Sequence, residues 1–357
     1  MKAVNMRRPN SKALIFCVFF LSIFNFSIYA EQEKNVNEKY SGVGIYIDQD
    51  MFVPFSNEDR DYTMGFAVEF FGAKNKGLYP LDGLVKTAGE WLGIKKSENK
   101  IIYSFMLGTL VYTPDDLSDS QPIYNDRPYS SLVYLSNKRV HTDGKNALAA
   151  EVLLGIIGSK LPGEVQAGLH SLYRDVSGLE ATEDPVEPKG WAHQISNGGE
   201  LTVRLRLTNS QLQSKLTYPG RFDLATTMGL SLGFQTNANV GLAIRAGKLR
   251  SPYWSLPYDP VNRGNFLPSN AKDEWYFWGA INARLIGYDA LLQGQFRQSN
   301  VIFSYDEIEH IVYDAGMGLT LGFEKSQLTF SANTKSPDLK LTSRQQVWGS
   351  INYLYYF

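Results

Sequence analysis

Residues 222–234 read FDLATTMGLSLGF, and apolar residues alternate in this stretch with small or polar ones. Even positions carry Phe, Leu or Met, except for Thr226, whereas odd positions carry Asp, Ala, Thr, Gly or Ser. A period of two predicts a β-strand with one apolar face. The stretch is long enough to cross a bilayer at a tilt. A small or polar second face is typical of the lumen of a membrane barrel, whereas a soluble barrel has the opposite sense.

Similar stretches recur along the chain, and the last of them ends at Phe357. We predict strands at 42–52, 62–72, 101–113, 129–140, 146–157, 199–210, 221–235, 238–248, 274–286, 310–323, 325–334 and 345–357. The sequence therefore predicts an all-β fold, an antiparallel transmembrane β-barrel of about twelve strands, the even number that bacterial barrels prefer. The alternative count adds a pair of short strands within 290–304.

The connections follow from this strand order. If the amino end starts in the periplasm, the outer loops fall at 53–61, 114–128, 158–198, 236–237, 287–309 and 335–344. The third outer loop contains a short helical stretch that runs from Gly163 to near Gly178. Asp143 and Gly144 form a hairpin signal at an inner turn.

Residues 1–30 have the organisation of a signal peptide. Basic residues precede an apolar run, and Ala30 stands at the cleavage position before a polar stretch. The apolar run is shorter than the roughly 20 residues of a membrane-spanning helix. We predict cleavage after Ala30, so that residues 31–357 form the mature barrel in the outer membrane of a Gram-negative bacterium. Cys17 is the only cysteine, and a mature chain without it excludes disulfides and thiol catalysis.

The charge balance excludes one class of partner. Four of the 35 Lys and Arg lie in residues 1–30, which leaves 31 against 36 Asp and Glu. A net negative chain has no basic surface for nucleic acid. No apolar run after Ala30 reaches the roughly 18 residues that would indicate a transmembrane helix.

Three polar clusters map to the outer rim. They are residues 48–52 with 59–65, residues 125–129, and the helix of the third loop, where Gln166, His170 and Tyr173 or Arg174 share one face. Their convergence predicts a site. The simpler interpretation is a salt-bridge network facing lipopolysaccharide, formed by Asp59, Arg60, Asp126 and Arg127, with Pro128 only fixing a turn.

These residue types suit ester hydrolysis. His170 can take a proton from water. Asp48 and Asp50 are expected on one strand face, where their oxygens suit Ca²⁺, and such an ion, or an arginine, stabilises an oxyanion. Ser171 points about 100° away from His170 on a helix, so water is the expected nucleophile.

In these residues the chain resembles the outer-membrane lipid A 3′-O-deacylases of the LpxR type. The shared motifs are Gln49-Asp50, Asp59 to Gly65, Asp126 to Tyr129, Glu164 to His170 and Gly190 to Asn197. Each motif is weak alone, but their order is specific, and they all lie within residues 42–200.

The resemblance implies a twelve-stranded barrel whose site lies between the barrel wall and a helix of the third outer loop. It implies removal of the 3′-linked acyloxyacyl group of lipid A, with Ca²⁺ as oxyanion stabiliser and His170 as the base. Asp50 and its neighbours Gln49 and Asp48 would be metal or water ligands, with Thr63 as a supporting polar group. Gln166 would be the partner of His170 on the helix. We expect lipopolysaccharide as substrate and a monomer in the outer membrane.

The chain departs from the family pattern at three points. Gln49 stands where the family has Asn, and its side chain is one methylene longer. The loop after His170 is expanded, so that Glu180 and Glu187 are both candidates for the family's glutamate, and we include Glu187 among the site residues. No basic residue stands at 115–121 to contact a phosphate.

Two other functions remain open at this stage. An outer-membrane phospholipase would use a serine nucleophile, for which Ser171 is the nearest candidate to His170. A non-enzymatic pore or surface-binding barrel would leave lipid A unchanged.

Overall fold

The computed structural model describes residues 41–53, 60–72, 83–84, 87, 100–142, 145–177, 186–253 and 272–357. The predicted signal peptide, residues 54–59 of the first outer loop, the predicted hairpin turn at Asp143 and Gly144, and Glu180 lie outside these ranges. What was predicted for them stays a prediction.

Twelve strands form one closed antiparallel barrel, in which each strand pairs with its neighbours in sequence and β1 closes on β12. The strands are β1 (Ser41–Gln49), β2 (Asp61–Gly72), β3 (Lys100–Thr113), β4 (Ser130–Thr142), β5 (Asn146–Ile157), β6 (Glu200–Leu212), β7 (Phe222–Gly233), β8 (Gln235–Lys248), β9 (Trp275–Asp289), β10 (Ile311–Gly322), β11 (Ser326–Lys335) and β12 (Gln346–Tyr356). The predicted fold class and strand count are confirmed, and the described residues 290–304 contain no strand.

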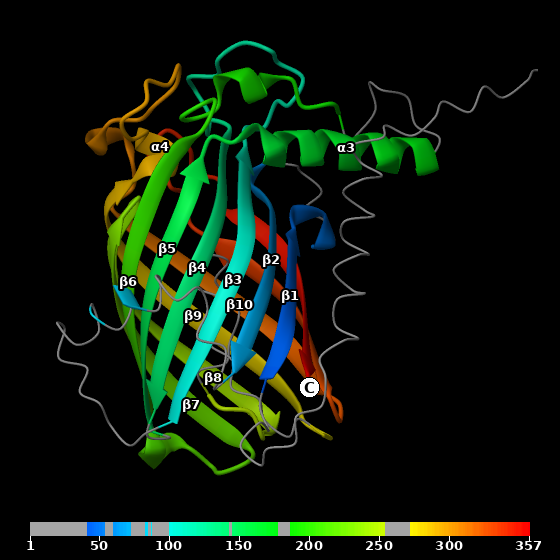
Figure 1. Ribbon diagram of the computed structural model, residues 1–357, viewed down its shortest axis with the longest axis vertical. Helices are drawn as coiled ribbons and strands as arrows, with labels where there is room; N and C mark the ends of the chain where they lie inside the picture. The colour runs from blue at the N-terminus through cyan, green and yellow to red at the C-terminus, as the bar shows by residue number, and fades with distance from the viewer. Residues whose placement is uncertain are drawn as a thin grey trace, which may run out of the picture.

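The helices are short and lie mostly at one end of the barrel. They are η2 (Asp50–Phe52), α3 (Lys160–Ser177), η3 (Gly190–His193), η4 (Ser214–Leu216), α4 (Ala290–Gln293) and η5 (Tyr305–Glu307). Figure 1 shows α3 at the upper end, running across the barrel axis and projecting beyond the wall. None of the helices among the described residues is long and apolar enough to span a bilayer.

One predicted strand ends early. The alternation predicted a strand to residue 52, but β1 ends at Gln49, because the Asp50 side chain accepts from Met51 N at 2.7 Å and Val53 N donates to Asp50 O at 3.2 Å. A side chain that bonds to its own backbone competes with the ladder. The resulting turn η2 contacts β12 and β2.

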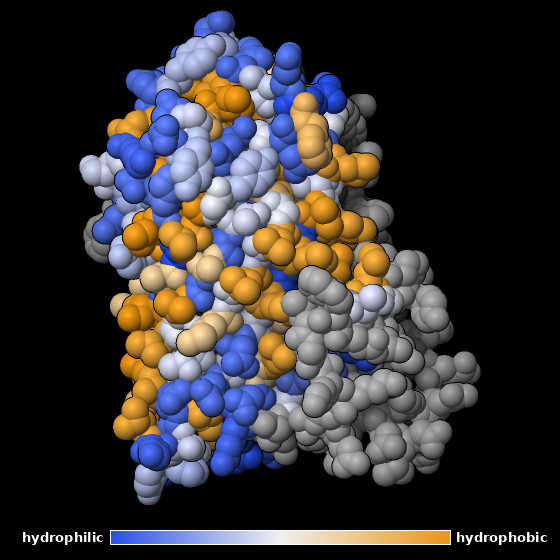
Figure 2. All heavy atoms as spheres, turned by 90° about the vertical axis from the view of Figure 1, so that its left-hand side faces the viewer, coloured by the Kyte–Doolittle hydropathy of each residue, from blue (hydrophilic) through white to orange (hydrophobic). Residues whose placement is uncertain are grey.

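The alternation sorts side chains between lipid and lumen as predicted. Met228, Leu230 and Leu232 of β7 are exposed on the outer surface. Figure 2 shows apolar residues gathered across the middle of one face and hydrophilic residues towards both ends. This distribution is that of a barrel whose middle is surrounded by hydrocarbon.

Charged side chains fill the lumen. Glu151 pairs with Arg204 at 3.1 Å and with Lys138 at 3.6 Å, and all three are buried. Glu69 accepts from the hydroxyls of Tyr46 and Ser104. Because each of these charges meets a partner, the lumen acts as a packed polar core.

Candidate site between the barrel wall and helix α3

Helix α3 turns a polar face inward. Gly163, Gln166, His170 and Arg174 are buried, and their spacing of three and four residues places them on one side of the helix. The helix contacts β3 and β4, so that this side lies against the barrel wall. The predicted helix is confirmed. Between Tyr173 and Arg174, it is Arg174 that joins the buried face, whereas Tyr173 is exposed.

The wall behind α3 is shielded from its surroundings. Val111 and Thr113 of β3 point outward, as the exposed Leu107 does lower on the same strand, yet both are fully buried. Ser131 of β4 also points outward and is buried. The third outer loop therefore covers the outer surface of the wall at the extracellular ends of β3 and β4.

The end of the third outer loop folds back and holds α3 in place. Trp191 of η3 packs on Tyr129 with ring centroids 4.8 Å apart, and its Nε1 donates to Gln166 Oε1 at 3.1 Å. A Cβ on Gly163 would come within 2.7 Å of the Trp191 ring, so glycine permits this close approach. Ser131 Oγ lies 2.9 Å from Gln194 Oε1, which ties the same loop to β4.

His170 is oriented by a main-chain carbonyl. Its Nδ1 lies 2.8 Å from Val186 O. A carbonyl oxygen can only accept, so Nδ1 carries the proton, and in the neutral ring Nε2 keeps the lone pair. The structure thus gives Nδ1 a carbonyl partner, while Gln166 accepts from Trp191. Glu187 follows Val186 and is exposed.

The end of β1 divides its residues between the two sides of the wall. Asp48 faces the lumen, where it accepts from the Tyr62 hydroxyl at 2.6 Å. Gln49 faces outward, and its Nε2 lies 3.9 Å from Met64 Sδ. Asp50 is buried in the η2 turn, so the expected common face of Asp48 and Asp50 is interrupted by the end of the strand.

Thr63 sits at a register shift between Tyr62 and Met64 of β2. Its Oγ1 is 2.6 Å from Thr113 Oγ1, and both hydroxyls are buried. The extra residue in β2 brings Thr63 to the outward-facing Thr113. Because β2 stands between the η2 turn and the strands that contact α3, Thr63 lies on the wall between Asp50 and the helix.

A calcium ion would find few carboxylates here. Among the residues that the structure describes, no three Asp, Glu, His or Cys side chains gather where they could hold a metal ion. Ca²⁺ takes six to eight oxygen ligands but accepts amide and backbone carbonyl oxygens. The donor set of Asp50, Gln49 and the η2 carbonyls therefore fits a hard cation only if backbone, water or substrate oxygens complete the shell.

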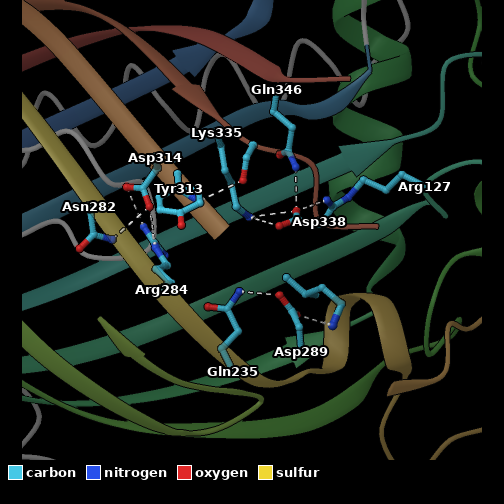
Figure 3. A network of polar contacts seen from close by, with 12 residues as sticks. Arg127, Gln235, Asn282, Arg284, Asp289, Tyr313, Asp314, Lys335, Asp338 and Gln346 are labelled. Atoms are coloured by element: carbon cyan, nitrogen blue, oxygen red, sulfur yellow. Dashed lines mark hydrogen bonds and ion pairs between the residues drawn. The ribbon is translucent and has the colours of Figure 1, made fainter. Parts of the chain in front are cut away.

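On the lumen side of the rim, buried charged side chains pair with one another. Figure 3 shows Arg127, Lys335 and Gln346 converging on Asp338. Burial raises the pKa of Asp338, but Lys335 and Arg127 outweigh it and hold that pKa below its usual range. Arg127 also stacks over the Tyr112 ring at 4.0 Å. We call Arg127, Lys335, Asp338 and Gln346 the inner rim cluster.

A second set of ion pairs lies nearer the surface. Arg344 bridges Asp126 and Asp115, and Arg60 pairs with Asp115 at 3.2 Å. The simpler interpretation is confirmed only in that Arg60, Asp126 and Arg127 form salt bridges; their partners are Asp115, Arg344 and Asp338. Arg127 is buried on the lumen side, and contact with lipopolysaccharide stays a prediction. Arg60 and Arg344 supply positive charge beside the second outer loop, whose residues 115–121 contain none.

Several residues of this site were not predicted individually. Thr113 and Ser131 stand in ordinary strand positions, and Val186 contributes only its backbone. Trp191 and Gln194 belong to the motif from Gly190 to Asn197, and the structure shows that they hold α3 against β4.

Comparisons with known proteins agree with this architecture. The family model described as outer membrane protein LpxR matches residues 14–357. The structure of LpxR from Salmonella typhimurium matches with a TM-score of 0.65 and 13% identity, over 88% of this chain and 100% of that chain. At this identity the match shows the fold. The translocator domain of the autotransporter NalP from Neisseria meningitidis is 8% identical over 97% of both chains, and its TM-score of 0.40 carries no argument. No curated protein matches the sequence.

Proposed function

Because this chain belongs to the LpxR family of outer-membrane proteins, we propose that it is a lipid A deacylase that hydrolyses the 3′-linked acyloxyacyl ester of lipopolysaccharide. The observation that carries the proposal is the orientation of His170. It lies on the buried face of α3, with Nδ1 donating to Val186 O, so that in the neutral ring Nε2 is the nitrogen that carries the lone pair and can act as a base.

The reaction needs one base and one water. Nε2 of His170 takes a proton from water as the water oxygen bonds to the ester carbonyl carbon. When the tetrahedral intermediate collapses, the bond to the sugar oxygen breaks, and the same nitrogen returns the proton to that leaving oxygen. The products are a free acyloxyacyl acid and a sugar hydroxyl. Thr63 supports the wall side of the site, and Gln166 fixes the helix through Trp191.

Calcium forms a separate part of the proposal. We propose Asp50 and Gln49 as its protein ligands in preference to Asp48, whose carboxylate bonds to Tyr62 on the lumen side. A bound calcium ion stabilises negative charge on an ester oxygen. Calcium binding to Asp50→Asn, measured by calorimetry against Asp48→Asn, tests this assignment without any measurement of activity. Equal binding by the two variants would show it to be wrong.

The alternative functions have less support. Ser171 is exposed on α3 and points away from the buried face that holds His170, which disfavours a serine phospholipase. The paired charges of the lumen disfavour an open pore.

Mass spectrometry of lipid A tests the function directly. Cells that express the protein, at controlled Ca²⁺, should contain lipid A lighter by the 3′ acyloxyacyl group, and cells that express His170→Ala should not. Unchanged lipid A with well-inserted wild-type protein would refute deacylase activity. Loss of acyl groups from glycerophospholipids instead would identify a phospholipase.

A further inference from the structure

Helix α3 has an exposed apolar side that nothing in the proposed reaction uses. Leu161, Leu169, Leu172 and Tyr173 are between 43% and 50% exposed. Large apolar side chains gathered on one exposed helix face usually mark a contact surface. We call this set the apolar face of α3.

The three sides of α3 differ in chemistry. At 3.6 residues per turn, the apolar face is centred roughly 130° from the buried side that holds His170. A third side carries exposed charges, including Lys160, Glu164 and Asp175. A helix with one apolar and one charged exposed side is the type that lies in the plane of a membrane interface.

The position of α3 continues the lipid-facing surface of the barrel. Leu154 and Ile156 of β5 point outward and are 40% and 41% exposed, and α3 begins three residues after β5 ends. Figure 1 shows that α3 runs across the barrel axis and projects beyond the wall at the rim. The apolar surface of β5 therefore leads directly to the apolar face of α3.

We propose that the apolar face of α3 is immersed in the hydrocarbon of the outer leaflet, with the charged side turned to water. Tyr173 would then stand at the interface, which amphipathic aromatic rings prefer. If the proposed function holds, the helix carries His170 at the depth of the acyl esters, and acyl chains reach the site without crossing water.

Spin labels on two sides of α3 test the immersion. In the full-length chain with Cys17→Ala, which removes the only native cysteine, a nitroxide is attached at Leu172→Cys or at Glu164→Cys as the matched control. Each protein is reconstituted in phosphatidylethanolamine vesicles. The label at 172 should collide with oxygen, which concentrates in hydrocarbon, and be protected from a water-soluble nickel chelate. The label at 164 should show the opposite.

Three results would overturn the proposal. The label at 172 could be as accessible to nickel as the label at 164, which would place the apolar face in water. It could be shielded from both reagents, which would mean that protein covers it. Spin–spin broadening between labels at 172 would identify a second copy of this chain as the occupant.

Activity provides a second readout, which rests on the proposed function. Replacing Leu161, Leu169 and Leu172 with Ser should lower deacylation of membrane-embedded lipopolysaccharide by roughly tenfold, because interfacial binding scales with buried apolar area. Activity on detergent-dispersed substrate should persist. The control Glu164→Gln with Asp175→Asn should keep both activities. A wild type inactive on both substrates refutes the function, whereas equal activity of wild type and the Ser variant on membranes refutes the immersion.

Discussion

The two surfaces of the barrel wall at the outer rim use buried polar residues in opposite ways. On the lumen side, Arg127, Lys335 and Asp338 neutralise one another. On the outer side, behind α3, the buried polar residues include His170, Gln166, Arg174 and threonine hydroxyls. Breaking a buried ion pair destabilises a fold, whereas a histidine held in a fixed orientation can move a proton. We infer that stability depends on the inner side and chemistry on the outer side.

The largest expected effect comes from the outer side. His170→Ala should lower deacylation by roughly 10²- to 10⁴-fold, which is the usual contribution of a positioned general base. The midpoint of thermal unfolding in detergent, followed by circular dichroism, should stay close to that of wild type. If the variant lost its fold together with its activity, His170 would be a structural residue and not the proposed base.

The inner rim cluster should show the reverse. Asp338→Asn leaves Arg127 and Lys335 without their shared counter-charge, and breaking a buried pair costs about 3–5 kcal/mol. We expect a lower unfolding midpoint and, at temperatures where the barrel is intact, near wild-type deacylation. Gln346→Leu, which removes a neutral contact to the same carboxylate, is the milder control.

The lowered pKa of Asp338 should make the stability of the barrel depend on pH. Because Lys335 and Arg127 hold the folded pKa of Asp338 below its usual range, its contribution is complete above the unfolded value of about 3.9 and is lost as pH falls towards the folded pKa. The unfolding midpoint should therefore drop below about pH 4 in wild type and drop less in Asp338→Asn. Parallel curves would show that Asp338 does not titrate in this window.

The division between the two sides also explains what the sequence could predict. The alternation of apolar and polar residues predicted the strands correctly, because each side chain must face either lipid or lumen. A register shift of one residue would turn every lipid-facing side chain into the lumen. It could not assign the partner of Arg127, since Asp338 is 211 residues away and approaches only when the barrel closes. Nor could it find the Val186 carbonyl, because every residue has one.

The end of β1 shows the limit of alternation most clearly. The pattern that places Asp48 and Asp50 on one face is valid only while the strand continues. Asp50 starts a turn instead, and its local bond to Met51 N was not visible in the spacing. Predicted metal ligands at strand ends therefore need the structure, whereas the helix-face residues His170 and Gln166 were assigned correctly to one face by spacing alone.

A smaller effect distinguishes two hydroxyls that share one hydrogen bond. Thr63→Val and Thr113→Val each remove the contact between the two Oγ1 atoms and leave one buried hydroxyl without it, at a cost of about 1–3 kcal/mol. Both variants should lose similar stability. If the Thr63 hydroxyl supports the charge of the transition state, Thr63→Val should also lower the activity of the folded protein by roughly tenfold. Thr113→Val should leave the activity of the folded protein unchanged. Equal activities, measured at matched folded fractions, would assign Thr63 to the scaffold.

The smallest effect is expected at the residue next to the proposed base. Ser171 is exposed on α3, whereas His170 is buried, and successive helical residues point about 100° apart. Ser171→Ala should therefore keep deacylation close to wild type, and stability should change by no more than about 0.5 kcal/mol, as at other surface positions. The measurement is acyl release from lipopolysaccharide by wild type, Ser171→Ala and His170→Ala under the same conditions. If Ser171→Ala were as inactive as His170→Ala, a serine nucleophile would replace water, and α3 would have to present its exposed side to the substrate.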